Sequence, residues 1–167
     1  MGAFGNLVHR SLVFFHKSFG GKVPEGEITV ELRKQMEDLY FHVGNKIERG
    51  VFKSALEEIF ASIRSANKYF DQEQPWATVK NDEKKCKNTL YTCVQIIANL
   101  SNLFSPFIPF VYRKIKELLQ TKENKWKYSK VSPFHPIKQA EILFERIDKQ
   151  KIEEEVERMK REERGSC

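Results

Sequence analysis

Apolar side chains recur at intervals of three and four residues along most of this chain, which is the spacing of one face of an α-helix. The pattern predicts five main helices, over about residues 4–19, 30–48, 51–71, 82–104 and 106–120. No segment alternates apolar and polar residues as a half-buried strand does, and no repeat recurs at a fixed period. We therefore predict an all-α fold, a packed bundle of about five main helices.

Capping and turn residues predict where these helices begin and end. Thr29 is a suitable N-cap for the second helix, because its hydroxyl can accept a hydrogen bond from the first turn. The sequence Gln74-Pro75-Trp76 predicts a non-helical connection, because the residue before a proline is pushed out of the α region. Ser105 and Pro106 have the character of an N-cap and a first helical residue, so we expect the fifth helix to begin there.

The last part of the chain carries weaker helical signals. Residues 121–136 contain Trp126 and two prolines, and we expect an irregular stretch that packs its aromatic side chains back on the bundle. Asp148 is a suitable cap for a charged last helix over residues 149–163. We assign residues 1–147 to the helical bundle and residues 148–167 to a charged helical tail or linker.

Composition and charge narrow the class of protein and of partner. Hydrophobic residues make up 40% of the chain and charged residues 31%, which excludes wholesale disorder and is typical of a soluble globular protein. The net charge of +6 and the isoelectric point near 9.2 favour a polyanionic partner, because clustered Lys and Arg bind phosphates. The charged residues of 148–164 sum to −1, so the positive excess lies within residues 1–147.

The cysteines and the apolar runs indicate the compartment. There are three cysteines, an odd number without a Cys-x-x-Cys pair, which argues against a disulfide framework. We interpret Cys86 and Cys93 as small buried or half-buried side chains and propose no metal site. No apolar run reaches the roughly 18 residues of a membrane span, and the N-terminus lacks the pattern of a signal peptide. A cytoplasmic protein without membrane contact is expected.

Catalytic motifs are not found in the sequence, whereas residues suited to recognition are. None of the histidines, His9, His16, His42 and His135, belongs to a known nucleophile motif, and no glycine loop could cradle a phosphate. Asn6 and Arg10 are four residues apart, so on a helix they can act together on one base edge. The alternative is a helix cap for Asn6 and a solvated side chain for Arg10.

Pro75 and Trp76 form a second candidate element. A rigid proline followed by tryptophan can hold an indole face where an unstacked base can lie on it. Tryptophan is more often a core residue, so core packing of Trp76 is the alternative interpretation.

Four segments together resemble a known family. They are Asn-Leu-Val-His-Arg at 6–10, Ala-Asn-Lys-Tyr-Phe-Asp-Gln-Glu-Gln-Pro-Trp at 66–76, Leu-Phe-Ser-Pro-Phe-Ile-Pro at 103–109 and Leu-Phe-Glu-Arg-Ile-Asp at 143–148. In order and spacing they resemble the anticodon-binding domain of methionyl-tRNA synthetases, which are class I aminoacyl-tRNA synthetases. Synthetases for leucine, isoleucine, valine and cysteine share a helical bundle, but the segment from Asn-Lys-Tyr to Pro-Trp points to methionine.

The resemblance implies roles for the candidate residues. In that family, residues matching Asn6 and Arg10 read the first bases of the CAU anticodon of methionine tRNA, and the tryptophan matching Trp76 stacks on its cytosine. Pro75 belongs to the same anticodon-binding element. His9 and Lys68 are candidates for contact with the tRNA backbone. Asn67 and Tyr69 are expected to fix the end of the third helix.

The resemblance is confined to this one domain. The nucleotide-binding motifs His-Ile-Gly-His and Lys-Met-Ser-Lys-Ser of the parent enzymes are missing, so we expect no catalysis and no cofactor in this chain. ATP and methionine belong to the catalytic domain of a parent methionine-tRNA ligase, which is an expected partner, and a further C-terminal domain is an open alternative. A different hypothesis is a helical protein-interaction module whose basic charge is incidental.

Overall fold

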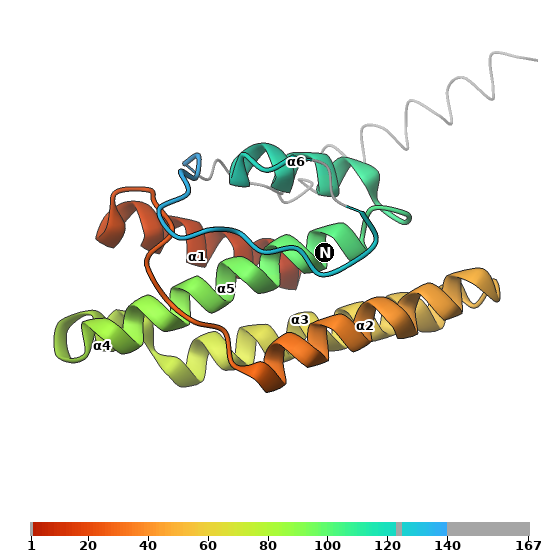
Figure 1. Ribbon diagram of the computed structural model, residues 1–167, viewed down its shortest axis with the longest axis horizontal. Coiled ribbons are helices and arrows are strands. Elements are labelled where there is room, and N and C mark those ends of the chain that lie inside the picture. Colours follow the sequence, from red (N-terminus) through yellow and green to blue (C-terminus); the bar gives the residue numbers. More distant parts are fainter. Residues whose placement is uncertain (1, 123–124, 140–167) are drawn as a thin grey trace, which may run out of the picture.

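The computed structural model describes residues 2–122 and 125–139, and these residues form α-helices and connecting segments without a strand (Figure 1). The helices are α1 (Gly2–Phe19), α2 (Val30–Glu48), α3 (Phe52–Glu73), α4 (Pro75–Asn81), α5 (Glu83–Leu103) and α6 (Pro109–Leu119). The predicted all-α fold class is confirmed. The predicted last helix at 149–163 and the boundary between residues 147 and 148 lie outside the described residues.

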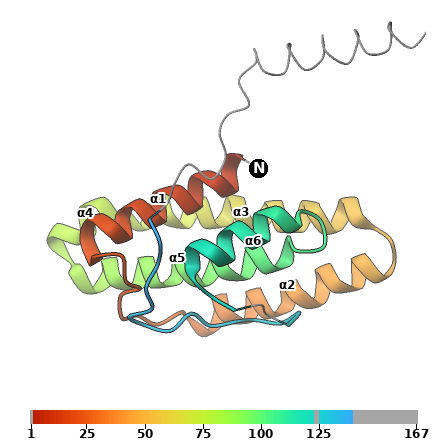
Figure 2. The ribbon, with the colours of Figure 1, turned by 90° about the horizontal axis from the view of Figure 1, so that it is seen from above.

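Helix α5 is the centre of the bundle, and α1, α2, α3, α4 and α6 all pack against it (Figures 1 and 2). Every residue from Thr89 to Phe104 is buried, which is expected of a helix surrounded by other helices. At its C-terminal end, the Phe104 ring lies 5.4 Å from that of Phe4 and 5.7 Å from that of Phe60, measured between centroids. Full burial of a side chain, as for Phe4 and Phe104, stabilises the fold by about 1.5–3 kcal/mol.

Three amide side chains of α5 hold the extended segment that follows α6 in the sequence. Gln95 exchanges two hydrogen bonds with the backbone of Val131, at 2.9 and 2.8 Å, and Asn99 does the same with Ser129, also at 2.9 and 2.8 Å. Asn102 donates to the carbonyl of Lys125 at 3.0 Å. These amides satisfy backbone groups that would otherwise be buried without partners.

Two aromatic side chains of the same segment, Trp126 and Tyr128, pack on the bundle as predicted for residues 121–136, whereas Phe134 is 62% exposed. The Trp126 indole N–H donates to the carbonyl of Tyr40 at 3.0 Å, and the two rings meet edge to face at 5.5 Å. Trp126 still keeps 39% of its surface exposed, so it covers α2 from outside and is not a core residue.

Two helix boundaries differ from the prediction. Residues 74–76 were expected to be non-helical, but only Gln74 leaves the helix, and Pro75 begins α4 because its missing N–H is not needed there. The fifth main helix begins at Pro109 and not at Pro106. Residues 104–107 form turns, and Ile108, which precedes Pro109, has an extended backbone with φ −138° and ψ 70°. The Thr29 cap is confirmed, since its hydroxyl accepts a bond from the Leu32 N–H at 3.3 Å.

Cys86 and Cys93 are both buried and unbridged, as interpreted from the sequence. Burial raises the pKa of the Cys93 thiol to about 12. Among the described residues, no helix is long and apolar enough to cross a membrane.

Candidate nucleic-acid interface

The flank of α1 next to α3 presents the first group of candidate residues. Leu7, Val8 and Ser11 are buried on the side of α1 that faces the bundle. Asn6 and Arg10 are one turn apart on a flank of α1 beside α3, where Asn6 is exposed and Arg10 is half-buried. The periodicity of α1 therefore places both polar side chains outside its buried apolar face.

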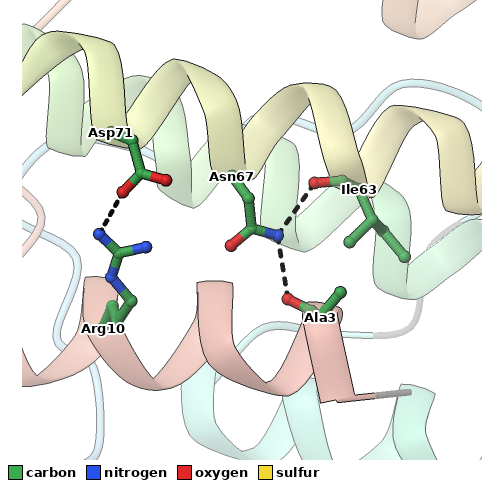
Figure 3. Close-up of polar contacts among 5 residues, drawn as sticks. All are labelled: Ala3, Arg10, Ile63, Asn67 and Asp71. Carbon is green, nitrogen blue, oxygen red and sulfur yellow. Dashed lines mark hydrogen bonds and ion pairs between the residues drawn. The ribbon is translucent and has the colours of Figure 1, made fainter.

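Arg10 is held in place by α3 and α4. Its guanidinium donates to the carboxylate of Asp71 at 2.5 Å (Figure 3). The guanidinium carbon also lies 4.5 Å from the centroid of the Phe70 ring and 5.9 Å from that of Trp76. An arginine over aromatic faces gains cation–π energy, and here the carboxylate sets its orientation. These contacts place Arg10 beside the indole of Trp76.

Trp76 is an exposed surface residue, 46% accessible, and not a core residue. Its ring packs against buried Phe70, with centroids 6.1 Å apart and planes inclined at 43°. Pro75, in contrast, is buried, and its carbonyl accepts a bond from the Cys86 thiol at 3.5 Å. Pro75 thus presents little surface of its own.

Gln74 makes the corner between α3 and α4. Its backbone is left-handed, with φ 46° and ψ 60°, and its N–H donates to Phe70 at 3.2 Å. Its carbonyl accepts from the N–H groups of Ala77 and Thr78, at 2.9 and 3.0 Å. This single residue ends one helix and begins the next, which brings Trp76 next to Phe70.

Asn67 ties α3 to the start of α1. Its side-chain amide donates to the carbonyls of Ala3 and Ile63, at 3.0 Å each (Figure 3). The expectation that Asn67 fixes the end of the third helix is wrong, because α3 continues to Glu73 and the side chain bridges to another helix. Its role follows from the packing of α1 on α3, which local sequence does not reveal.

A groove of about 610 Å³ runs between α1 and α3 beside these residues. It is lined by Ala3, Asn6, Arg10, Arg64, Asn67, Lys68, Asp71, Gln72 and Gln74. Neither Arg64 nor Lys68 forms an ion pair within the described part of the chain. The lining is therefore rich in cations and amides, the groups that bind phosphates and base edges in RNA.

Comparison with known proteins assigns this fold to a family. Residues 20–164 match the family described as the anticodon binding domain of methionyl tRNA ligase. The chain belongs to this family. Trp76 and Lys68 lie inside the matched stretch of the anticodon-binding domain, and Asn6 and Arg10 precede it.

Similar proteins are methionine-tRNA ligases. The chain is 46% identical over 159 residues to the methionine-tRNA ligase of Bacillus cereus strain Q1. It is 45% identical over 159 residues to the methionine-tRNA ligase of Bacillus anthracis strain CDC 684. Each alignment covers 95% of this chain and 29% of the relative. The anticodon-binding domain thus spans less than a third of these relatives.

Solved structures agree with this assignment. The apo form of Mycobacterium tuberculosis methionyl-tRNA synthetase superposes with a TM-score of 0.78 at 26% identity, over 86% of this chain and 32% of that chain. The same synthetase bound by methionyl-adenylate gives 0.78 at 25% identity, over 86% and 31%.

The site residues predicted from the sequence and the residues that line the groove overlap in part. The groove brings together Asn6, Arg10 and Lys68, with Trp76 against Arg10 at its end. His9 is exposed on α1 but does not line the groove. Sequence reasoning missed the groove residues Arg64, Asp71, Gln72 and Gln74. Arg64 precedes Lys68 by one helical turn, a spacing that could have revealed it.

Proposed function

We propose that this chain binds the anticodon loop of methionine tRNA and selects the CAU anticodon. The observation that carries the proposal is the cluster of Arg10, Phe70 and the exposed Trp76 at the end of a cationic groove. An exposed indole backed by a buried ring is a stacking platform, and single-stranded loops offer bases that can be splayed onto it.

The two sides of the groove have different tasks in this proposal. Asn6 and Arg10 supply donors and acceptors to base edges, which select the sequence. Arg64 and Lys68 contact phosphates, which position the loop without reading it. The net charge of +6 adds a long-range attraction for RNA that salt weakens.

The activity of the longer relatives belongs to the proposal as well. Because this chain spans 29% of a methionine-tRNA ligase, we place the use of ATP and methionine in the remainder of such an enzyme. The catalytic domain is then the partner that receives the tRNA acceptor end, while this chain checks the anticodon. The chain alone should not activate methionine.

The test is binding of a labelled RNA hairpin that carries the CAU loop, followed by fluorescence anisotropy. Wild-type protein should prefer this hairpin over one with a changed first anticodon base. Trp76→Ala should weaken binding by about 1–3 kcal/mol through loss of the stacking surface. A matched control is Phe41→Ala, which removes an aromatic ring that is 67% exposed on α2, outside the groove.

The control variant should bind RNA like wild type. If wild type bound both hairpins equally, or neither, the proposal of anticodon selection would fail, and the hypothesis of a helical protein-interaction module would take its place.

A further inference from the structure

Gln74 has a backbone conformation that is costly for a glutamine. With φ 46° and ψ 60° it lies in the left-handed region, which glycine and asparagine adopt more readily. Its backbone N–H and carbonyl both form hydrogen bonds at the corner, but a glycine could form the same bonds. Local backbone requirements therefore leave its long amide side chain unexplained.

Gln74 lines the groove together with Asn6 and Arg10. The residue is exposed, and its amide makes no hydrogen bond with any residue in the described ranges 2–122 and 125–139. It stands two positions before Trp76, on the same corner that presents the indole. An unpaired donor and acceptor thus lie beside the proposed stacking surface.

Gln120 provides an internal comparison. Among the described residues it is the other glutamine with a left-handed backbone, φ 50°, at the end of α6. Its amide donates to the carbonyl of Pro136 at 3.3 Å, so its side chain has a structural use. Gln120 does not line the groove. The contrast indicates that the Gln74 amide serves a ligand and not the fold.

We propose that the side-chain amide of Gln74 reads the adenine at the middle position of the CAU anticodon. This inference rests on the proposed function. An amide presents a donor and an acceptor side by side, which match the N6 amino group of adenine and its neighbouring ring nitrogen. In this arrangement the cytosine stacks on the indole of Trp76. The adenine that follows it meets Gln74, which precedes Trp76 in the chain.

The experiment compares three hairpins, with CAU, with a changed first base, and with guanine in place of the middle adenine. Gln74→Gly keeps the left-handed backbone and deletes the amide, and Gln74→Met keeps the length of the side chain without the amide. Both variants should bind CAU about tenfold more weakly, and the preference for adenine over guanine should fall by the same factor. The preference at the first base should persist.

The melting temperature and a matched control variant separate a loss of base recognition from a loss of folding stability. The melting temperature of Gln74→Gly should stay close to that of wild type, because relief of the left-handed backbone offsets the greater freedom of the unfolded chain. Gln120→Gly makes the same change away from the groove and should leave all three RNA affinities unchanged.

The outcomes distinguish the two proposals. If Trp76→Ala weakened CAU binding but both Gln74 variants kept the wild-type preference for adenine, the role of Gln74 would be refuted and anticodon recognition would stand. If wild type showed no preference among the three hairpins, both would be refuted.

Discussion

Arg10 of α1 and Asp71 of α3 are joined by a hydrogen bond of 2.5 Å across 61 positions of sequence. Their side chains keep 30% and 57% of their surface exposed, so this ion pair adds about 1 kcal/mol or less to stability. Its main effect is to orient a guanidinium that also lies over Phe70 and beside Trp76. The pair thus sets the geometry of the groove between α1 and α3 more than the stability of the fold.

Asp71→Asn should therefore change selectivity without unfolding the domain. Loss of the carboxylate frees Arg10 and adds one positive charge to the groove, so hairpins with altered anticodons should bind more tightly and discrimination should fall. Anisotropy titrations of matched and altered hairpins measure this ratio. Glu117→Gln removes an exposed acid that pairs with Lys138 elsewhere, and is the control. If Asp71→Asn left the ratio of affinities for matched and altered hairpins unchanged, Asp71 would not be needed to orient Arg10.

Arg64 and Lys68 should contribute electrostatic affinity without sequence preference. Arg64→Ala or Lys68→Ala should weaken matched and altered hairpins by the same factor. Each should also lower the slope of log affinity against log salt by about 0.7 for single-stranded RNA. Lys34→Ala, at an exposed position of α2 outside the groove, is the matched control. If the salt slopes of Arg64→Ala, Lys68→Ala and Lys34→Ala were equal, the RNA phosphates would contact residues other than Arg64 and Lys68.

Asn99→Ala should destabilise the domain and leave its selectivity intact. The Asn99 amide bonds the backbone of Ser129, and its oxygen also accepts from the Tyr40 hydroxyl at 3.0 Å. Its removal leaves buried groups without partners, which costs about 1–3 kcal/mol of unfolding free energy for each group. Urea titration measures the loss, and Asn81→Ala, at the exposed end of α4, is the control. A loss of RNA selectivity at full stability would contradict this assignment.

The folded domain should lose stability as pH rises above about 9. Burial raises the pKa of Cys93 from 9.0 to about 12, and burial also raises that of Tyr40. Between the unfolded and folded pKa values of Cys93, the unfolded chain releases a proton that the folded chain retains, so alkaline pH favours unfolding. Denaturation at a series of pH values should show the fall, and Cys93→Ala should reduce it. A flat profile from pH 9 to 11 would contradict the burial of an ionisable thiol.

The helices could be predicted because their signals are local. The hydroxyl of Thr29 caps the N–H of Leu32 only three residues later, and the apolar spacing of α1 directs Asn6 and Arg10 to one side. The short helix α4 was missed because the rule for the residue before a proline excludes the right-handed helical region but not the left-handed conformation of Gln74. The start of α6 was placed too early because two prolines competed for the first position, and Pro109 took it.

The amino-acid sequence by itself determined the all-α class, the positions of most helices and, through a resemblance, the family. It also made Asn6, Arg10 and Trp76 the candidates for anticodon binding. Only the tertiary structure decided that Asp71 orients Arg10, that Asn67 ties α3 to α1, and that Arg64 and Gln74 share their groove. Helical periodicity depends on residues within about four positions of each other. A groove between two helices depends on how the helices pack, and packing is set by contacts between residues far apart in sequence, such as that between Phe4 and Phe104.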